Sequence, residues 1–266
     1  MEDVVTVVSA AEKAGYQWFS CPEHVCIPTP VASTRGGRYW DPLATLSFVA
    51  ARTSTIGLLT HVLVLGYHHP LEVVKSYGSL DEASGGRVIL GVGVGTLRPE
   101  FELLGVPYTD RGARADDALR AIRASFGNRH PRYDGPYYAF DDVVVDPCGL
   151  PRHVEMWVGG RTRRSLRRAL EIGDGWIPFG MTLAELRTLL DDEDLSRRRA
   201  QRERFEVILA PEPPVDPVGE PGPCAETVGA YVAAGATGLH VRFVHRSKQH
   251  YMEQVSALSE LVGAPE

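Results

Sequence analysis

Short apolar runs alternate with amphipathic segments along most of the chain. An apolar run bounded by glycine or proline is typical of a buried strand, whereas apolar residues three or four positions apart indicate a helix. Roughly seven runs are separated by about eight helical segments, and the runs cover residues 16–20, 56–65, 87–95, 156–160, 175–179, 205–210 and 238–244. Helical segments of this kind can connect parallel strands. The pattern therefore predicts an α/β fold, and it favours a TIM-type (β/α)8 barrel over an open doubly wound sheet.

The predicted helices fill the intervals between these runs. They cover residues 3–14, 41–50, 71–83, 111–126, 162–172, 183–204, 225–234 and 248–262. Residues 27–39 are predicted to lack regular structure, 211–223 form a proline-rich linker, and about 127–155 form an excursion in which 139–145 is a hairpin strand. Since the chain begins with a helix, we expect a single barrel domain, residues 1–266, that is incomplete at its N-terminus.

Glycines occupy alternate positions in the run from Arg87 to Gly95. In an extended strand, Gly91, Gly93 and Gly95 project to one face, where the absence of side chains permits close approach to the backbone. A flat ligand could lie there, or the face could belong to a tight barrel interior that needs small residues. The sequence leaves both interpretations open. The dinucleotide-binding spacing G-x-G-x-x-G is absent.

Composition and charge limit the kinds of binding partner that we expect for this protein. The 28 Lys and Arg residues and the 34 Asp and Glu residues give a net charge of -6, so no basic field favours nucleic acid. The four cysteines lack the paired spacing of a zinc site and are too few for a disulfide framework. No apolar run reaches the length of a membrane span. We therefore expect a cytoplasmic protein that binds neither nucleic acid nor membrane.

Candidate chemistry lies where the predicted strands end, because barrel enzymes place their sites there. These ends carry many glycines and few strong acids or bases, which suits a flat cofactor better than hydrolysis by paired carboxylates. The ends are Glu23-His24, Thr60-His61-Val62, Gly93-Val94-Gly95-Thr96, Gly159-Gly160-Arg161-Thr162 and Pro178-Phe179.

Each of these candidates also has a purely structural interpretation. His24 could exchange a proton with a substrate, or be a structural loop histidine; His61 could be a satisfied core histidine. Gly159 to Thr162 precede a helix and could cradle a phosphate, with charge from Arg161, or could form a capped turn with surface arginines. No second carboxylate or H-x-H pair supports a metal site at Glu23, His24 and His61.

Taken together, these motifs resemble the luciferase-like monooxygenase superfamily, in particular its actinobacterial branch that uses the deazaflavin coenzyme F-420. The match covers roughly residues 4–180 and is specific as a set. The matching pieces are Ala11-Glu12-Lys13-Ala14-Gly15-Tyr16, Glu23-His24, Tyr39-Trp40-Asp41-Pro42, His69-Pro70, Leu80-Asp81, Ser84 to Gly95, Glu100-Phe101, Leu104-Gly105-Val106, Arg111-Gly112-Ala113-Arg114, Val158-Gly159-Gly160 and Gly173-Asp174-Gly175-Trp176.

The resemblance implies an oxidoreductase that moves a hydride between a bound deazaflavin or FMN and a small organic substrate, or that uses reduced flavin with oxygen. It implies that His24 is the candidate proton donor. His61 is a further candidate catalytic group, as the acid–base partner of His24 in a reaction without redox. The remaining implied cofactor-binding residues lie at the strand ends: Glu23, Thr60, His61, Val62, Gly93, Gly95, Gly159, Gly160, Arg161 and Thr162.

The sequence departs from the family pattern in three ways, and these departures support an alternative in which the barrel binds no cofactor. The first strand is absent, His61 stands where the family usually has a small residue, and Thr96-Leu97 replace the glutamate of its sugar-phosphate dehydrogenases. The last departure argues against a sugar phosphate as substrate. A degenerate barrel without cofactor would instead act as a partner protein, or as a non-redox acid–base catalyst using His24 and His61. In either case we expect a homodimer, because an open barrel exposes strand edges.

Overall fold

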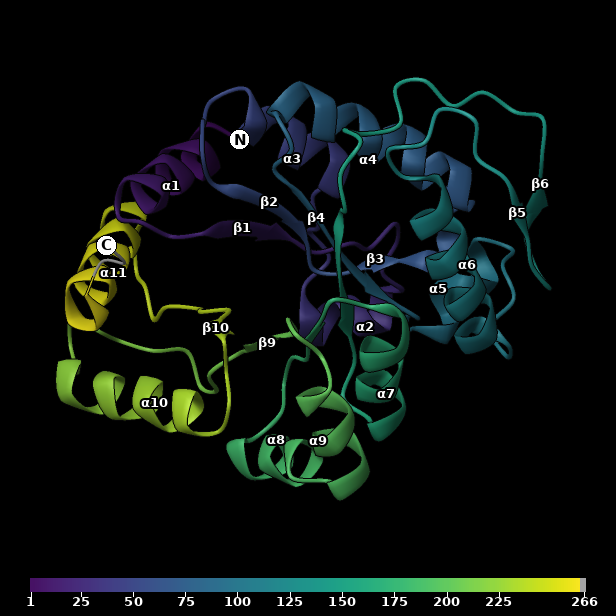
Figure 1. Ribbon diagram of the computed structural model, residues 1–266. Coiled ribbons are helices and arrows are strands. Elements are labelled where there is room, and N and C mark those ends of the chain that lie inside the picture. The colour runs from purple at the N-terminus through teal and green to yellow at the C-terminus, as the bar shows by residue number, and fades with distance from the viewer. Residues whose placement is uncertain (264–266) are drawn as a thin grey trace. The chain divides into compact units, whose positions relative to one another are not determined.

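The computed structural model, drawn in Figure 1, describes residues 1–263. These residues form two compact units. Unit 1 comprises residues 1–19, 52–56 and those from Trp157 onward, and unit 2 comprises residues 20–51 and 57–156. The chain therefore leaves unit 1 and returns to it more than once. That the two units together form a single domain, as the sequence leads us to expect, stays a prediction.

Unit 2 is built on short parallel strands covered by helices. Strand β4 pairs in parallel with both β2 and β3, with Leu58 opposite Val88 and Leu63 opposite Val92. Strands β5 and β6 form a separate antiparallel hairpin. The elements are α2 (Thr29–Arg35), α3 (Pro42–Ala50), β2 (Gly57–Thr60), β3 (Leu63–Val64), η1 (Leu65–Tyr67), α4 (Pro70–Ser84), β4 (Val88–Gly93), α5 (Arg98–Leu103), α6 (Arg111–Ser125), β5 (Tyr133–Asp134) and β6 (Ala139–Phe140).

Local signals explain where the central helices of unit 2 begin and end. Asp41 caps α3, because its carboxylate accepts a hydrogen bond from the Ala44 N–H at 2.7 Å, and Pro42 follows in the first turn. Helix α4 starts at Pro70 and stops at Gly85, whose φ of 70° lies in the left-handed region that glycine adopts without strain. Asp81 near the end of α4 is fully buried.

Unit 1 contains the second set of parallel strands. Strand β8 lies between β7 and β9, and β10 pairs with β9 through Gly238 opposite Ile208 and Leu239 opposite Leu209. Strands β1 (Trp18–Cys21) and β7 (Glu155–Gly159) cross from one unit to the other. The remaining elements are α1 (Glu2–Lys13), α7 (Arg163–Ile172), β8 (Gly175–Ile177), α8 (Leu183–Leu190), α9 (Glu193–Ala200), β9 (Glu206–Leu209), α10 (Pro221–Ala233), β10 (Gly238–Leu239) and α11 (Lys248–Val262).

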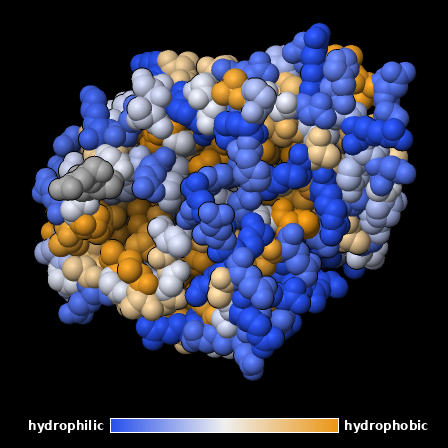
Figure 2. Space-filling view, in the orientation of Figure 1, coloured by the Kyte–Doolittle hydropathy of each residue, from blue (hydrophilic) through white to orange (hydrophobic). Residues whose placement is uncertain are grey.

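An apolar cluster joins the terminal helices of unit 1. Val215, Cys224, Phe243, Val255 and Leu258 are buried together, and partly buried residues of α1, α10 and α11 pack around them. Figure 2 shows apolar surface where α10 and α11 lie, and the exposed Val232 and Val262 belong to these helices. No helix within residues 1–263 is long and apolar enough to cross a membrane.

The structure confirms the alternation of helices and strands but corrects several segments. Residues 27–39 are not irregular throughout, because Pro30 in the first turn starts the short helix α2. The helix predicted over 183–204 is two helices: α8 ends at Leu190, and the Asp192 carboxylate caps a new helix through the Leu195 N–H.

The strands are shorter than their apolar runs. The run 56–65 divides into β2 and β3, and the run 238–244 forms a strand only over Gly238–Leu239, since Phe243 bridges to Val215 instead. The run 87–95 ends as a strand at Gly93. Gly95 therefore lies outside the strand, with a φ of 75°. The acidic segment after it is the short helix α5.

Candidate functional site

Glu23 lies in unit 2, two residues after the end of β1, and its side chain is 5% exposed. The Val64 N–H of β3 donates a hydrogen bond to Glu23 Oε2 at 2.6 Å, and His68 Nε2 lies 2.7 Å from Glu23 Oε1. Both carboxylate oxygens thus have protein partners. Glu23 ties the end of β1 to β3 and to the turn before α4.

His68 is the basic partner of this pair. Burial of its ring opposes the charged form, but the hydrogen bond and the charge of Glu23 outweigh burial and raise the pKa of His68. The Glu72 carboxylate, one turn into α4, lies 3.8 Å from His68 Nδ1 and acts in the same direction. A charged imidazole is therefore favoured between two carboxylates.

His24, which follows Glu23 in the sequence, faces a different carboxylate, that of Glu100. His24 Nδ1 lies 2.8 Å from Glu100 Oε2, and the edge of the His24 ring contacts Tyr39 at a centroid distance of 4.6 Å. The His24 side chain is 20% exposed, whereas that of Glu100 is fully buried. A partly exposed imidazole backed by a buried carboxylate is an arrangement that general acid–base catalysts use.

Glu100 also holds the backbone beside His24. The Val25 and Cys26 N–H groups donate to Glu100 Oε1 at 2.7 Å and 3.1 Å. Burial, together with the charge and hydrogen bonding of Glu100, raises the pKa of the Tyr67 hydroxyl. Donors from two segments of the chain, residues 24–26 and Tyr67, therefore converge on one buried carboxylate.

Thr60, His61 and Val62 lie beside these residues at the end of β2. The Thr60 hydroxyl donates to the Gly91 carbonyl at 2.7 Å, and the His61 N–H donates to the Cys21 carbonyl at 2.8 Å. The peptide bond between His61 and Val62 is cis. Thr60 is fully buried, so its hydroxyl serves the strand pairing of β2 and β4.

The glycines of the β4 region are covered by protein atoms. A Cβ on Gly91 would overlap the Thr60 carbonyl, one on Gly93 would lie 2.6 Å from a Val62 methyl, and one on Gly95 would lie 2.5 Å from the Phe101 ring. Close packing therefore requires glycine at these positions. The geometry favours the tight-interior interpretation of the two that the sequence left open.

Gly159 to Thr162 lie in unit 1, where β7 ends and α7 begins. Thr162 forms a capping box with Ser165: the Ser165 N–H donates to the Thr162 hydroxyl at 3.2 Å, and the Thr162 N–H donates to the Ser165 hydroxyl at 3.1 Å. The Trp176 indole N–H donates to the Gly160 carbonyl at 3.1 Å. Thr162 is therefore the N-cap of α7, which agrees with the capped-turn interpretation of this segment.

Arg161 remains available beside this turn. Its side chain is exposed, and its guanidinium lies 5.6 Å from the centre of the Phe179 ring at the end of β8. The exposed Phe179 and Arg161 together present an aromatic face and a positive charge at the start of α7. A phosphate or the edge of an aromatic ring is the kind of group that such a pair contacts.

The predicted site residues thus fall into two groups. Contacts connect Glu23, His24, Thr60, His61, Val62, Gly93 and Gly95 within unit 2. Gly159, Gly160, Arg161 and Thr162 lie together in unit 1. Their proposed contacts to a cofactor stay predictions. Among residues 1–263, no group of three or more His, Cys, Asp or Glu side chains is arranged to hold a metal ion.

Sequence reasoning missed two residues of unit 2. Glu100 appeared only in the matching piece Glu100-Phe101, with no role in the site assigned to it. His68 adjoins the proline turn at His69-Pro70 and was considered only as a metal ligand, which was judged unlikely because His68 and His69 do not face each other; nothing in the sequence places it beside Glu23. Both are long-range partners, 76 and 45 residues away from theirs.

Comparison with known proteins identifies the family of this chain. The family model for luciferase-like monooxygenases matches residues 1–217. An uncharacterized protein from Mycobacterium tuberculosis is 33% identical over 197 residues, which are 68% of this chain and 70% of that protein. An FMNH2-dependent dimethylsulfone monooxygenase from Pseudomonas putida is 25% identical over 146 residues, 53% of this chain and 40% of that enzyme.

Among solved structures, the coenzyme F-420-dependent tetrahydromethanopterin reductase from Methanopyrus kandleri superposes with a TM-score of 0.77, covering 97% of this chain and 93% of that one at 14% identity. The fold is therefore α/β of the TIM-barrel type with an incomplete barrel, as predicted. With its model matched over residues 1–217, this chain belongs to the luciferase-like monooxygenase family.

Proposed function

We propose that this protein is a flavin- or deazaflavin-dependent oxidoreductase that moves a hydride between the cofactor and a small organic substrate, with His24 exchanging the accompanying proton. The observation that carries the proposal is the His24–Glu100 pair at the end of β1, 2.8 Å apart, with the imidazole partly exposed and the carboxylate buried. Family membership supplies the reaction class, since the relatives and structural neighbours are named for reduced FMN and coenzyme F-420.

Each group, taken by itself, has residues that suit one part of such a cofactor. A partly exposed histidine beside a buried strand end suits a redox ring that must exchange a proton away from bulk water. In unit 1, Arg161 and the turn Gly159-Gly160 at the start of α7 would hold a phosphate, and Phe179 would cover it. When bound, the cofactor supplies the hydride; the protein orients it and handles the proton.

The unit 2 residues would contribute in distinct ways. Gly93 and Gly95 would shape the strand end by letting Val62 and Phe101 pack closely, and Glu23 would fix β3 against β1. The proposal includes a homodimer, because an incomplete barrel leaves strand edges that a second copy could cover. All four cysteines are free thiols, which supports a reducing, cytoplasmic location.

The activity test compares His24→Ala with the wild-type protein in cofactor turnover. Reduced deazaflavin and reduced FMN are supplied separately, with a panel of small carbonyl compounds or oxygen, and their reoxidation is followed by absorbance. We expect His24→Ala to lower turnover by about 10²- to 10⁴-fold, the range typical of a general acid. Cofactor affinity should stay within about threefold, a change of under 1 kcal/mol in binding free energy. Equal loss of affinity and turnover would assign His24 to binding instead.

One observation favours a second candidate function. The hydrogens of Gly91, Gly93 and Gly95 face Thr60, Val62 and Phe101, so this strand offers no bare face for a ring. A barrel without cofactor would then act as a partner protein or as an acid–base catalyst through His24 and His61. Unchanged cofactor fluorescence in the presence of excess protein would favour it.

A further inference from the structure

Glu100 is the most heavily bonded carboxylate near His24, and its own part in the proposed proton exchange has still to be assigned. It lies in α5, its side chain is fully buried, and it contacts the residue that the proposed function makes the proton donor. Burying a carboxylate is unfavourable unless hydrogen bonds compensate for the lost water. The question is what this arrangement does for His24.

We propose that Glu100 is a positioning residue that holds His24 with its proton on Nδ1, so that Nε2 is the atom that exchanges a proton with the bound reactant. A neutral imidazole has one donor nitrogen and one acceptor nitrogen, and the partner of one nitrogen decides the role of the other. An ionised carboxylate only accepts hydrogen bonds. The Glu100 Oε2 contact at 2.8 Å therefore makes Nδ1 the donor.

The other contacts of Glu100 fix the direction of this bond. Its second oxygen, Oε1, already accepts the Val25 and Cys26 N–H groups, so Oε2 is the oxygen directed at the imidazole. The same two hydrogen bonds hold the backbone at Val25 and Cys26, directly after His24. The Tyr39 ring makes a T-shaped contact with the imidazole and leaves it less room to rotate. Ring orientation and tautomer are thus set together, as in other carboxylate–histidine pairs.

Glu100→Gln separates this role from simple support of the loop. The amide oxygen can still accept the Val25 and Cys26 N–H groups, but the amide nitrogen would donate to His24 Nδ1 and reverse that bond. Glu102→Gln is the matched control, because Glu102 lies in the same helix, is 62% exposed and pairs with Arg98. Thermal unfolding of both variants reports whether the fold is kept.

Nitrogen-15 NMR of protein labelled at histidine reads the tautomer directly. The signals of His24 are assigned by their absence in His24→Ala, and spectra are taken at alkaline pH where imidazoles are neutral. We expect the Nδ1–H tautomer in the wild-type protein and in Glu102→Gln, and the Nε2–H tautomer in Glu100→Gln. An Nε2–H tautomer in the wild-type protein would overturn the proposal without any variant having to fold, and so would an unchanged tautomer in Glu100→Gln.

The kinetic consequence rests on the proposed function and is measured separately. In protein that turns over a cofactor, Glu100→Gln should lower kcat by about 10²-fold with KM unchanged, because only the proton exchange at Nε2 is lost. A KM change of the same size would mean that Glu100 merely supports binding. The NMR result is independent of any cofactor, so failure of the proposed function leaves the assignment of the tautomer intact.

Discussion

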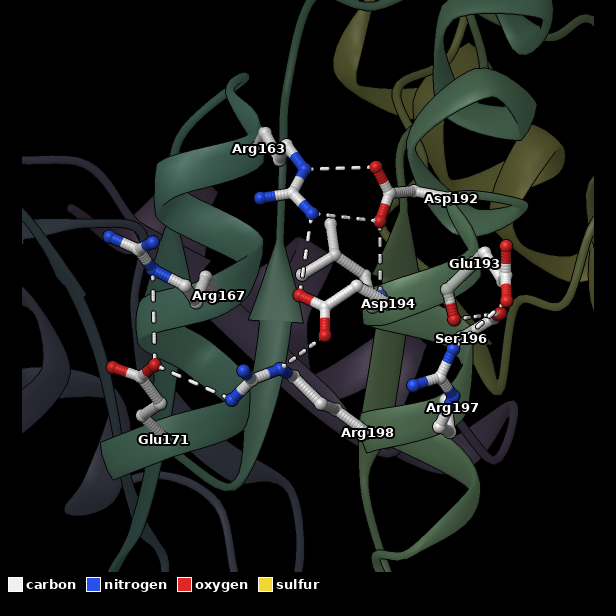
Figure 3. A network of polar contacts seen from close by, with 10 residues as sticks. Arg163, Arg167, Glu171, Asp192, Glu193, Asp194, Ser196, Arg197 and Arg198 are labelled. Carbon is white, nitrogen blue, oxygen red and sulfur yellow. Dashed lines mark hydrogen bonds and ion pairs between the residues drawn. The ribbon is translucent and has the colours of Figure 1, made fainter.

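The carboxylates of unit 2 and those on the outer helices of unit 1 do different work. In unit 2, Glu23, Asp81 and Glu100 are buried, and each holds backbone N–H groups together with a basic side chain. In unit 1, a network of arginines and carboxylates links α7 and α9 across the surface (Figure 3). Arg163 there contacts both Asp192 and Asp194, and all three remain substantially exposed.

The two sets of carboxylates differ because they differ in exposure to solvent. An exposed ion pair is screened by water and salt and contributes little, whereas a buried carboxylate must keep every hydrogen bond it has. The buried set therefore fixes loop geometry near the strand ends, and the exposed set mainly keeps the helix surfaces solvated. Four substitutions test this contrast, from the largest expected effect to the smallest.

Asp81→Ala should cause the largest loss of stability. Asp81 accepts bonds from Arg152 at 2.6 Å, from the Leu150 N–H at 3.1 Å and from the Val88 N–H at 3.3 Å. Removing it leaves these donors without their buried partner, which typically costs about 3–5 kcal/mol. Urea unfolding measures the loss, with the exposed Asp134→Ala as control. A loss under about 1 kcal/mol would show that water replaces the carboxylate.

His68→Gln should destabilise the protein in a pH-dependent way. Glu23 and Glu72 raise the pKa of His68, so the pair stabilises the fold fully below the unfolded pKa of about 6.5, and this contribution is lost as pH rises through the higher folded value. We expect a difference of about 1–2 kcal/mol at pH 5.5 that shrinks above pH 7. The exposed His130→Gln is the control, and a difference independent of pH would contradict the charged pair.

Glu12→Gln tests a carboxylate held by backbone rather than by arginine. Burial opposes its charge, but the N–H groups of Thr55, Ile56 and Ser54 together lower the pKa of Glu12 to about 2. The stabilisation is therefore present above pH 4.5 and lost as pH falls toward 2. We expect a loss of about 1 kcal/mol at pH 7 that disappears in acid, relative to Glu226→Gln. A loss that persists at pH 2 would point to packing instead.

Arg163→Met should have the smallest effect. The hydrogen bond and charge of Arg163 lower the pKa of Asp192, but both side chains are screened by solvent. We expect an unfolding midpoint indistinguishable from that of the wild-type protein at about 1 M salt, where screening acts within about 3 Å. A large salt-resistant shift would show that the network in Figure 3 acts cooperatively.

The helices were the most predictable part of the fold, because their signals are local. Asp41-Pro42 and the glycine after Ser84 mark the ends of α3 and α4 in the sequence itself. The break between α8 and α9 was missed because Asp191 and Asp192 stand in a continuous polar pattern, and only the cap geometry shows that a second helix begins.

For each contact in the candidate site, the sequence predicted only one of the two residues that meet. Glu23 and His24 could be chosen because they end an apolar run, whereas Glu100 and His68 approach them from distant parts of the chain. The glycines of β4 were correctly expected to permit close approach. What approaches them depends on the packing of Thr60, Val62 and Phe101, which spacing alone cannot reveal.

Cofactor binding is the central claim, and a direct titration tests it. The full chain is titrated with the oxidised and reduced deazaflavin coenzyme and with FMN, followed by fluorescence and calorimetry. Our account predicts tight, saturable binding of one of them, weakened at least tenfold by Arg161→Ala if that side chain holds the phosphate. Absence of binding by both, with the protein folded, would contradict the account and favour the barrel without cofactor.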